Sequence, residues 1–547
     1  MNNIKFLLTI FTVALFFACG SKSKDQAYYD GDEFTAQTEE GVEMRFKVIS
    51  AENKTVQVGN GDSNQHPQLS ELAAIDQNYE GKVTIPQEIN DYHVIRIAKC
   101  AFFKCKVSKI QIEEGVEIIK EDAFFCCENL KEILLPQSLK TIEKSVFWGC
   151  SNLTVINIPQ NVDYIGDNAL AADNLEILTV DKRNKNFDSR GNCNAIISTS
   201  TNTLIRGCKN TRIPNGITTI GENAFSNISL NKIEIPISVK TIKENAYGSC
   251  NLSNIYIPEN VEYISEKAFD DNCHINEITV SADNEYFDSR NNCNAIIDKR
   301  SQTLVKGCKS TIIPTDVKTI GAGAFRDCID LKDIRIPMGV QTIMTSAFFH
   351  SGITFISIPS SVKEIGDGAF YLTKLKKIEL ADGLEIIGER AFSHTNIEQL
   401  HIPATVRLMG KGVTKFCPYL RKIAVAPENK RFDSRNNCNA IINTNTRSLR
   451  AGCMNTIIPN DVLKIEEDAM YFVGLSRIII PEGIREIEED ALGGNVGLVV
   501  TSLIKEPFEA LLSNIEFDTL YVPKGTKEKY ASTKGWKKAK NIVELSE

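Results

Sequence analysis

An eleven-residue string that holds Asp, Ser, Arg and Cys side chains occurs three times in the chain. FDSRNNCNAII stands at 287–297 and again at 432–442, and FDSRGNCNAII stands at 187–197. A carboxylate, a hydroxyl and a thiol side by side are groups that acid–base and nucleophilic catalysis use. An Asp before a strand, however, commonly bonds to its own backbone and sets a turn. Triplicated chemistry at sites tens of residues apart would be unusual, so we interpret the strings as scaffold and expect no catalytic residues.

The histidines and cysteines do not form the patterns of a metal or catalytic site. The six histidines are His66, His93, His274, His350, His394 and His401. His350 and His394 are separated by two of the repeats that are described below, which is about 10 Å by strand spacing. This distance is too long for both side chains to bind one ion. The cysteines lack the doubled C-x₂₋₄-C spacing of structural zinc, and no serine-hydrolase, metalloprotease, P-loop or dinucleotide motif is present. We therefore expect a protein without enzymatic activity, metal or cofactor.

One phrase of about 22 residues recurs from residue 83 onward. Within each run the prolines after Ile-x-Ile are 22 or 23 residues apart, at Pro136, Pro159, Pro236, Pro258, Pro337 and Pro359. The alternating apolar residues before each Pro are typical of a short strand, and Pro ends a strand because it has no N–H to donate. One such unit cannot bury its apolar side alone, but stacked units can. The period therefore predicts a solenoid with one parallel strand per turn.

The phrase resembles the BspA-like, Treponema pallidum-type class of leucine-rich repeats found in bacterial surface proteins. The matching pattern is Ile-x-Ile-Pro-x-x-Val-x-x-Ile-Gly-x-x-Ala-Phe-x-x-Cys-x-x-Leu, best seen between Ile312 and Leu331. The resemblance implies a strand-rich leucine-rich-repeat solenoid over 83–523, with a parallel concave sheet and short irregular or helical convex segments. It also implies a surface location and attachment to host matrix proteins, such as fibronectin or fibrinogen, or to other cells.

Three turns are longer than the rest, about 33 residues instead of 23, and each holds one copy of the string. Runs such as CNAIIDKRSQTLVKGC predict a hairpin near 187–210, 287–310 and 432–455, with two-residue turns at 200–201, 300–301 and 445–446. Those turns would place six cysteines in opposed pairs within disulfide range, namely Cys193 with Cys208, Cys293 with Cys308, and Cys438 with Cys453. The second cysteine of each pair also occupies a core position of the repeat, so buried thiols are an equal alternative.

Most other cysteines share one column, three residues after the aromatic of Ala-Phe. They are Cys105, Cys127, Cys150, Cys250 and Cys328. Other turns carry Ser or Thr in this column or beside it. We expect the column to require a small side chain that hydrogen-bonds locally within the core.

The N-terminus has the layout of an export signal. Residues 1–18 hold one early Lys and an apolar run too short to span a bilayer, which needs about 20 residues. The ending Phe-Phe-Ala-Cys resembles a bacterial lipobox, which implies lipid attachment at Cys19 and a membrane-anchored protein; a secretory peptide with an incidental Cys is the alternative. We expect a tether at 19–30, a β cap at 31–82 and a C-terminal cap with a short helix at 524–547.

Surface residues of the repeat strands are the candidate binding site. The positions between buried strand residues should face outward, and several carry apolar, aromatic or charged groups: Leu134, Val155, Ile177, Tyr256, Arg335, Phe355 and His401. The net charge of −8 without a Lys/Arg-rich block argues against nucleic acid. We expect an extracytoplasmic, lipid-anchored protein that binds proteins, on the bacterial outer membrane or cell surface, with the periplasmic face as the alternative location. A glycan-binding or envelope-scaffolding module is the alternative, and an enzyme without a known motif is the third.

Overall fold

The computed structural model describes residues 28–61, 72–230, 232–512, 514–515 and 517–546. The expected signal peptide, Cys19 and most of the tether lie outside the described residues. In the described part of the chain, no helix combines the length and the apolar character needed to cross a bilayer.

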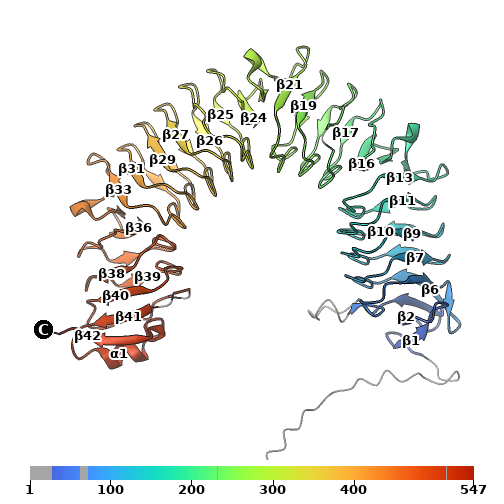
Figure 1. The fold of residues 1–547 in the computed structure, drawn as a ribbon, viewed down its shortest axis with the longest axis horizontal. Coiled ribbons are helices and arrows are strands. Elements are labelled where there is room, and N and C mark those ends of the chain that lie inside the picture. Colours follow the sequence, from blue (N-terminus) through green and yellow to red (C-terminus); the bar gives the residue numbers. More distant parts are fainter. Residues whose placement is uncertain (1–27, 62–71, 231, 513, 516, 547) are drawn as a thin grey trace, which may run out of the picture. The chain divides into compact units, whose positions relative to one another are not determined.

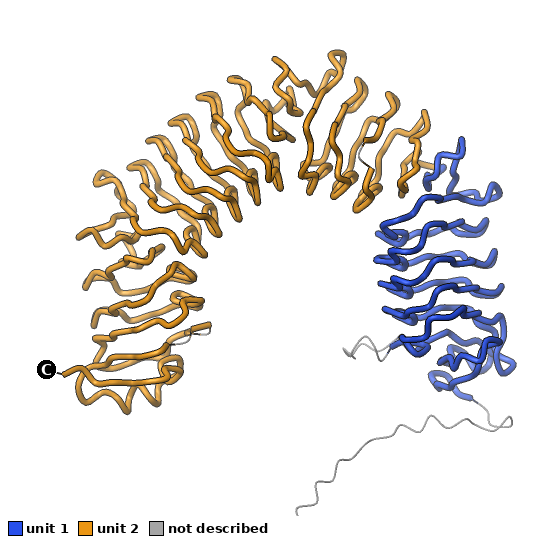
Figure 2. The backbone as a smooth tube through the Cα atoms, viewed as in Figure 1, with its two compact units in different colours: residues 1–199 blue, residues 200–547 orange. Residues whose placement is uncertain are grey.

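The chain divides into two compact units, residues 1–199 and 200–547 (Figure 2). The expected solenoid therefore spans both units, and the boundary lies in the loop of the first insertion. In unit 1 the parallel ladders stop just before that insertion.

The Ile-x-Ile-Pro segments form a column of strands of mostly four residues, called here the long strands (Figure 1). Most of them pair in parallel with the next long strand along the chain. Their burial alternates, as in β11, where Ile156 and Ile158 are buried and Val155 and Asn157 are exposed. In unit 1 the long strands are β4 (Lys82–Ile85), β7 (Lys109–Ile112), β9 (Glu132–Leu134), β11 (Val155–Ile158) and β13 (Ile177–Val180). In unit 2 they are β19 (Asn254–Ile257), β21 (Glu277–Val280), β27 (Phe355–Ile358), β29 (Lys377–Leu380), β31 (Gln399–Ile402), β33 (Lys422–Val425), β38 (Arg477–Ile480), β40 (Leu498–Ser502), β41 (Phe517–Val522) and β42 (Asn541–Glu544).

The return segments hold a second parallel column, of two-residue short strands. Each begins two or three residues after the buried Val, Leu or Ile that follows Pro, and its second residue is mostly buried. The expectation of irregular or helical return segments was thus partly wrong, since among the described solenoid residues these segments contain strands and turns. The short strands are β8 (Ile118–Ile119), β10 (Thr141–Ile142), β12 (Tyr164–Ile165), β17 (Thr219–Ile220), β18 (Thr241–Ile242), β20 (Tyr263–Ile264), β25 (Thr319–Ile320), β26 (Thr342–Ile343), β28 (Glu364–Ile365), β30 (Ile386–Ile387), β32 (Leu408–Met409), β37 (Lys464–Ile465) and β39 (Glu486–Ile487).

The Ala-Phe segments add a third line of contacts from turn to turn. The N–H of Phe325 donates to the carbonyl of Ala347 at 2.7 Å, and that of Phe348 donates to Ala369 at 2.8 Å. The buried rings stack in the same order, with centroids 5.0 Å apart for Phe325 and Phe348. Each turn is thus joined to the next by backbone bonds on three sides and by an aromatic stack inside. The apolar columns expected to face inward are buried, which confirms the predicted core.

The sharp bends around Ala-Phe explain why polar residues recur there. The residue before Ala has a positive φ in many turns, for example Asp122 at 57° and Asn245 at 55°. Asn, Asp and Gly tolerate this left-handed conformation better than other residues do. The residue type at these positions is therefore determined by the backbone conformation.

Each insertion is a short strand, a 3₁₀ turn and a hairpin. The loop between the hairpin strands has four residues, 299–302 in the second copy, and a register shift follows Ile296. The predicted two-residue turns were therefore wrong. The elements are β14 (Phe187–Asp188), η2 (Arg190–Asn192), β15 (Ala195–Ser198) and β16 (Thr203–Gly207); β22 (Phe287–Asp288), η3 (Arg290–Asn292), β23 (Ala295–Asp298) and β24 (Thr303–Gly307); and β34 (Phe432–Asp433), η4 (Arg435–Asn437), β35 (Ala440–Asn443) and β36 (Ser448–Gly452).

The ends of the two stacks are covered by caps. In unit 1, β1 (Glu33–Gln37), β2 (Glu43–Ser50) and β3 (Thr55–Val58) pair antiparallel, as their alternation predicts, and β3 joins β6 (Tyr92–Ile97), which also pairs with β5 (Glu88–Ile89). In unit 2, α1 (Lys527–Ser532) and η5 (Trp536–Lys538) bury Tyr530 and Trp536. The C-terminal cap also contains β42, which extends the long-strand column past the expected end at 523.

Candidate binding face

The exposed side of the long strands in unit 1 carries three apolar side chains, two of which are strand partners. Val155 and Ile177 are Cα partners on β11 and β13. Leu134 is on β9, at the position that pairs with Gln111 of β7. All three are exposed, as their places between buried strand residues predict.

The four candidate residues of unit 2 share that side of the long strands but do not form one cluster. Tyr256 on β19 is 53% exposed, and Phe355 on β27 is 38% exposed. His401 lies on β31 and is exposed. Arg335 is exposed in a segment that carries the Ile-x-Ile-Pro pattern without forming a strand. Only Arg335 and Phe355 line one hollow.

That hollow lies where the long-strand column is interrupted. Residues 333–336 are not a strand, so β27 has no strand partner on that side. The gap is about 530 Å³ in volume, and its walls include Ile334, Arg335, Met338 and Phe355. Met338 is 65% exposed and was not among the predicted residues. Its signal is the Met directly after Ile-x-Ile-Pro, where most other turns have a polar or small residue and one has Ile237.

Charged groups frame the aromatic wall of the hollow. Lys377 Nζ lies 5.3 Å from the centroid of the Phe355 ring and 2.7 Å from a carboxylate oxygen of Glu379. The hydrogen bond from Lys377 lowers the pKa of Glu379. An apolar surface bordered by Arg335 and Lys377 suits contact with a protein surface that presents aliphatic and acidic groups.

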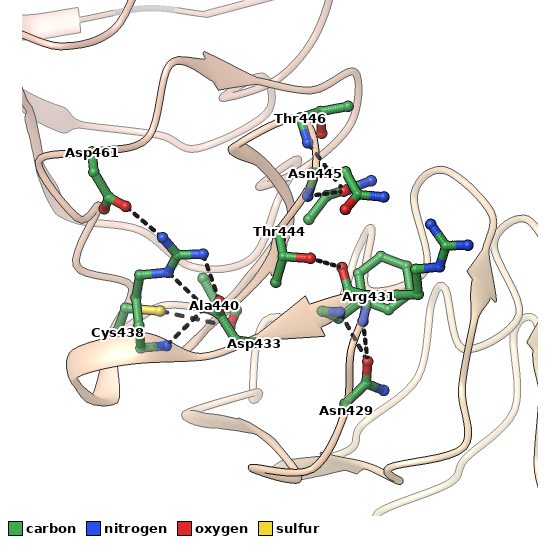
Figure 3. Close-up of polar contacts among 12 residues, drawn as sticks. Asn429, Arg431, Asp433, Cys438, Ala440, Thr444, Asn445, Thr446 and Asp461 are labelled. Carbon is green, nitrogen blue, oxygen red and sulfur yellow. Dashed lines mark hydrogen bonds and ion pairs between the residues drawn. The ribbon is translucent and has the colours of Figure 1, made fainter.

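The Asp-Ser-Arg triplets set turns, as their sequence predicts. In the third copy, the N–H of Arg435 donates to Asp433 Oδ1 at 3.1 Å, and the Arg435 guanidinium also bonds to Asp433 and Asp461. In the second copy, Ser289 Oγ donates to the carbonyl of Ala295 at 2.5 Å. The side chains of the triplet are occupied in holding the loop, and Figure 3 shows this arrangement around Asp433 and Asp461.

The residue that ties each insertion to the preceding turn is an Asn that sequence reasoning missed. Asn429 Nδ2 donates to the carbonyls of Pro403 and Val406, both at 2.9 Å. Its Oδ1 accepts from the N–H groups of Arg431 and Phe432 (Figure 3). The equivalent residues are Asn184 and Asn284, with the same pattern of bonds. The available signal was an Asn three residues before FDSR in all three copies.

The hairpin cysteines are thiols in the structure. None of the fifteen cysteines that it describes forms a disulfide, including Cys193, Cys208, Cys293, Cys308, Cys438 and Cys453. The geometry of the second copy gives the reason. Ala295 pairs with Gly307, and Cys293 precedes the strand at the end of η3, so it does not oppose Cys308. Burial raises the pKa of Cys293 to about 11. Of the two alternatives, disulfides and buried thiols, the structure contains the buried thiols.

The column of cysteines after Ala-Phe hydrogen-bonds within the core, as expected. The thiols of Cys127, Cys150 and Cys250 lie 2.9, 3.1 and 3.0 Å from the carbonyl of the aromatic residue one turn earlier. Thr373 fills the same slot and donates to the carbonyl of Phe370. Burial raises the pKa of Cys250 to about 12, so the thiol keeps its proton and can donate.

The histidines that the structure describes are dispersed, and two of them have well-defined partners. His350 Nδ1 lies 2.6 Å from Asp327 Oδ1. His394 stacks on Phe416, with centroids 3.9 Å apart, and burial together with Lys415 and Arg390 lowers its pKa. Across the described residues, no group of three or more His, Cys, Asp or Glu is placed to hold a metal ion.

Comparisons with known proteins agree with this architecture. A model of the BspA type leucine rich repeat region matches residues 81–197, 197–299, 296–421 and 439–507. No curated protein matches the chain.

Several solved structures are similar in fold. The pneumococcal vaccine antigen PcpA is 18% identical, with a TM-score of 0.35 over 95% of this chain and 100% of that one. A leucine-rich repeat protein from Bacteroides ovatus is 18% identical, with a TM-score of 0.32 over 92% and 98%. A leucine rich cell surface protein from Faecalibacterium prausnitzii is 20% identical, with a TM-score of 0.30 over 96% and 97%.

Proposed function

Because the chain belongs to the BspA-type leucine-rich repeat family, we propose that it is a non-enzymatic, lipid-anchored surface protein that binds proteins through its long-strand face. Proteins of this family are generally protein-interaction or surface proteins. The finer proposal is adhesion to host matrix proteins such as fibronectin or fibrinogen, or to other cells. The lipid on Cys19 would hold the protein at the bacterial outer membrane or cell surface.

The observation that carries the proposal is the set of exposed apolar side chains on the long strands. Large apolar groups that stay exposed beside charged residues are typical of protein interfaces, where a few aromatic anchors supply most of the binding energy. Phe355, Met338 and the cations around them supply such an anchor in unit 2. Tyr256 supplies another on β19.

A glycan platform has less support from the aromatic side chains outside the core. Phe349, Tyr371, His394 and Phe416 form a column on the Ala-Phe side, but their rings stack on one another. Sugars stack on the open face of a ring, and most of these faces are covered by the neighbouring ring. Glycan binding is therefore the less supported alternative, and the binding assay described next also tests it.

The test is a binding assay of the full mature protein on immobilised fibronectin and fibrinogen. The double variant Tyr256→Ala, Phe355→Ala should bind at least tenfold more weakly, since truncating an anchor residue costs more than about 1.4 kcal/mol. The matched control is Asn254→Ala, Ser357→Ala, which changes exposed polar residues of the same two strands. Equal binding by both double variants would overturn the proposed face. Retention on polysaccharide columns, with none on either protein, would favour the glycan alternative.

A further inference from the structure

The short-strand ladder of unit 2 ends with an open edge at the second insertion. Within the ladder, the backbone carbonyls of one short strand accept hydrogen bonds from backbone N–H groups of the next turn. The carbonyl of Lys240 accepts from the N–H of Tyr263 at 3.1 Å, and that of Ile242 accepts from the N–H of Ser265 at 2.9 Å. The corresponding carbonyls of β20 belong to Glu262 and Ile264. Among the described residues, no backbone N–H donates to either, and β20 has β18 as its one strand neighbour.

A groove of about 710 Å³ lies along this open edge. Tyr263 and Ile264 of β20 line one side, and the insertion lines the other with Phe287 of β22 and Val305 of β24. Thr303, Thr319 and Thr342 are a row of Cα partners on β24, β25 and β26, and they line the groove as well. The groove therefore combines unpaired backbone acceptors, apolar walls and a row of hydroxyl-bearing side chains.

The charges around the groove are almost balanced. Lys267 pairs with Glu244 at 2.7 Å, and Arg300 lies 3.6 Å from Asp298. Glu266 is exposed and adds one negative charge to the lining. A strongly anionic ligand is thus disfavoured, and an otherwise uncharged segment with one basic residue fits best.

We propose that this groove binds an extended segment of a partner polypeptide by strand addition to β20. A strand edge is recognised by the N–H groups of another backbone, which the carbonyls of Glu262 and Ile264 accept, while apolar pockets select alternate side chains. The ligand class follows from this chemistry, because a polypeptide supplies regularly spaced backbone donors. The expected ligand has alternating apolar residues, one of which packs on the exposed Tyr263 ring, and a Lys or Arg near Glu266.

The same arrangement of residues marks the other two insertions. The short strands that come last before them, β12 and β32, also end their ladders, and they carry Tyr164 and Leu408 at the position of Tyr263. All three side chains are more than half exposed. Other short strands have Thr, Ile, Glu or Lys there. A bulky exposed side chain is thus placed at the ladder edge before each insertion, and Tyr263 lines the groove described above.

This site is separate from the long-strand face of the proposed function, so the two can be tested independently. The probe is a display library of random twelve-residue peptides, selected on the full mature protein. Enriched peptides are then measured against Tyr263→Ala and against Tyr256→Ala, which removes an equally exposed tyrosine from the long-strand face. Thermal unfolding and circular dichroism check that both variants are folded.

The expected result is a family of peptides that bind at least tenfold more weakly to Tyr263→Ala and equally well to Tyr256→Ala. Methylation of alternate backbone nitrogens in those peptides should abolish binding, because strand addition needs the N–H groups. The proposal is overturned if no enriched peptide distinguishes the two variants, or if methylated peptides bind as well. It is also overturned if wild-type protein is a dimer that Tyr263→Ala makes monomeric, since the occupant is then a second copy of the chain.

Discussion

The slot three residues after each buried aromatic shows how one side chain joins two turns. Cys250 donates to the carbonyl of Phe225, which belongs to the turn before. The thiol is small enough for the core and keeps its proton because burial raises its pKa to about 12. Asn272 fills the equivalent slot one turn later and donates to the carbonyl of Tyr247 at 2.6 Å. Several turns therefore place a donor of limited size at this position, although Ile228 fills it after Phe225.

Replacing Cys250 by Ala should lower the free energy of unfolding by about 1–2 kcal/mol, because a hydrogen bond is lost and a small cavity forms. Urea unfolding followed by circular dichroism measures the change. Cys273→Ala is the matched control, since the Cys273 thiol is partly exposed and its contact is a long one, 4.0 Å from a carbonyl. Equal losses in the two variants would contradict the role assigned to the slot.

Stability should fall above about pH 9 as a consequence of the buried thiols. Burial raises the pKa of Cys250 and Cys328 from 9.0 to about 12. The unfolded chain therefore releases these protons first, so their contribution is constant below pH 9 and is lost as the pH rises toward 12. The variant Cys250→Thr, Cys328→Thr should show a shallower decline between pH 8 and pH 10.5 in urea unfolding. Parallel declines in variant and wild type would assign the effect to other groups.

At the scale of elements, each insertion is held by one buried amide. Asn284 makes four backbone bonds, two as donor to the preceding turn and two as acceptor from the insertion. Asn284 fixes the point at which the chain leaves the regular turn and enters the insertion. It therefore also helps to place β22 opposite β20 in the groove that contains Tyr263 and Phe287.

Replacing Asn284 by Ala should destabilise unit 2 by about 3 kcal/mol, because buried backbone groups lose their partners. Asn284→Asp should fail to restore stability, since a carboxylate accepts but does not donate. The neighbouring exposed residue gives the control Asp283→Ala. Hydrogen exchange of the second insertion locates the effect, and protection unchanged from wild type would be inconsistent with this anchoring role.

The sequence predicted the long strands well, because alternation and Pro mark them directly. It also predicted the buried columns, the outward residues of β11 and β13, and the turns formed by Asp433 and its equivalents. It did not predict the short strands, since two residues are too few for a period to be recognised. It did not predict that Cys293 and Cys308 fail to oppose each other, because a register shift after Ile296 changes the pairing and local sequence carries no sign of it. The hollow beside Phe355 depends on a strand that fails to pair, and that failure is a property of packing.

At the scale of the whole molecule, the proposed export and lipid anchoring rest on the N-terminal residues. Cys19→Ser should shift the protein from the detergent phase to the aqueous phase in Triton X-114 partition of cells that express it. Metabolic labelling with a palmitate analogue should lose its signal in the same variant. Surface exposure is a separate question, which protease treatment of intact cells answers. A variant that stays in the detergent phase would contradict lipid attachment at Cys19.

The repeated contacts make one complete turn removable. Glu364 and Ile386 are Cα partners in consecutive short strands, so deleting 364–385 brings Ile386 to the place of Glu364. We expect this variant to fold, with a cooperative transition within a few degrees of wild type, because stability in repeat proteins is a sum over neighbouring contacts. Deleting 364–374, half a turn, should abolish the transition. Similar melting of the two deletions would contradict the contact scheme.

The three lines of backbone bonds between successive turns also bear on how such a gene can change. Crossing-over between two repeats that are in phase removes or duplicates a segment whose cut surfaces match, so the encoded rod grows or shrinks without a new folding problem. Crossing-over between repeats that are out of phase leaves unmatched surfaces, so selection eliminates its products. Length is therefore the property that a lineage carrying this gene can vary most freely, in whole steps of one repeat.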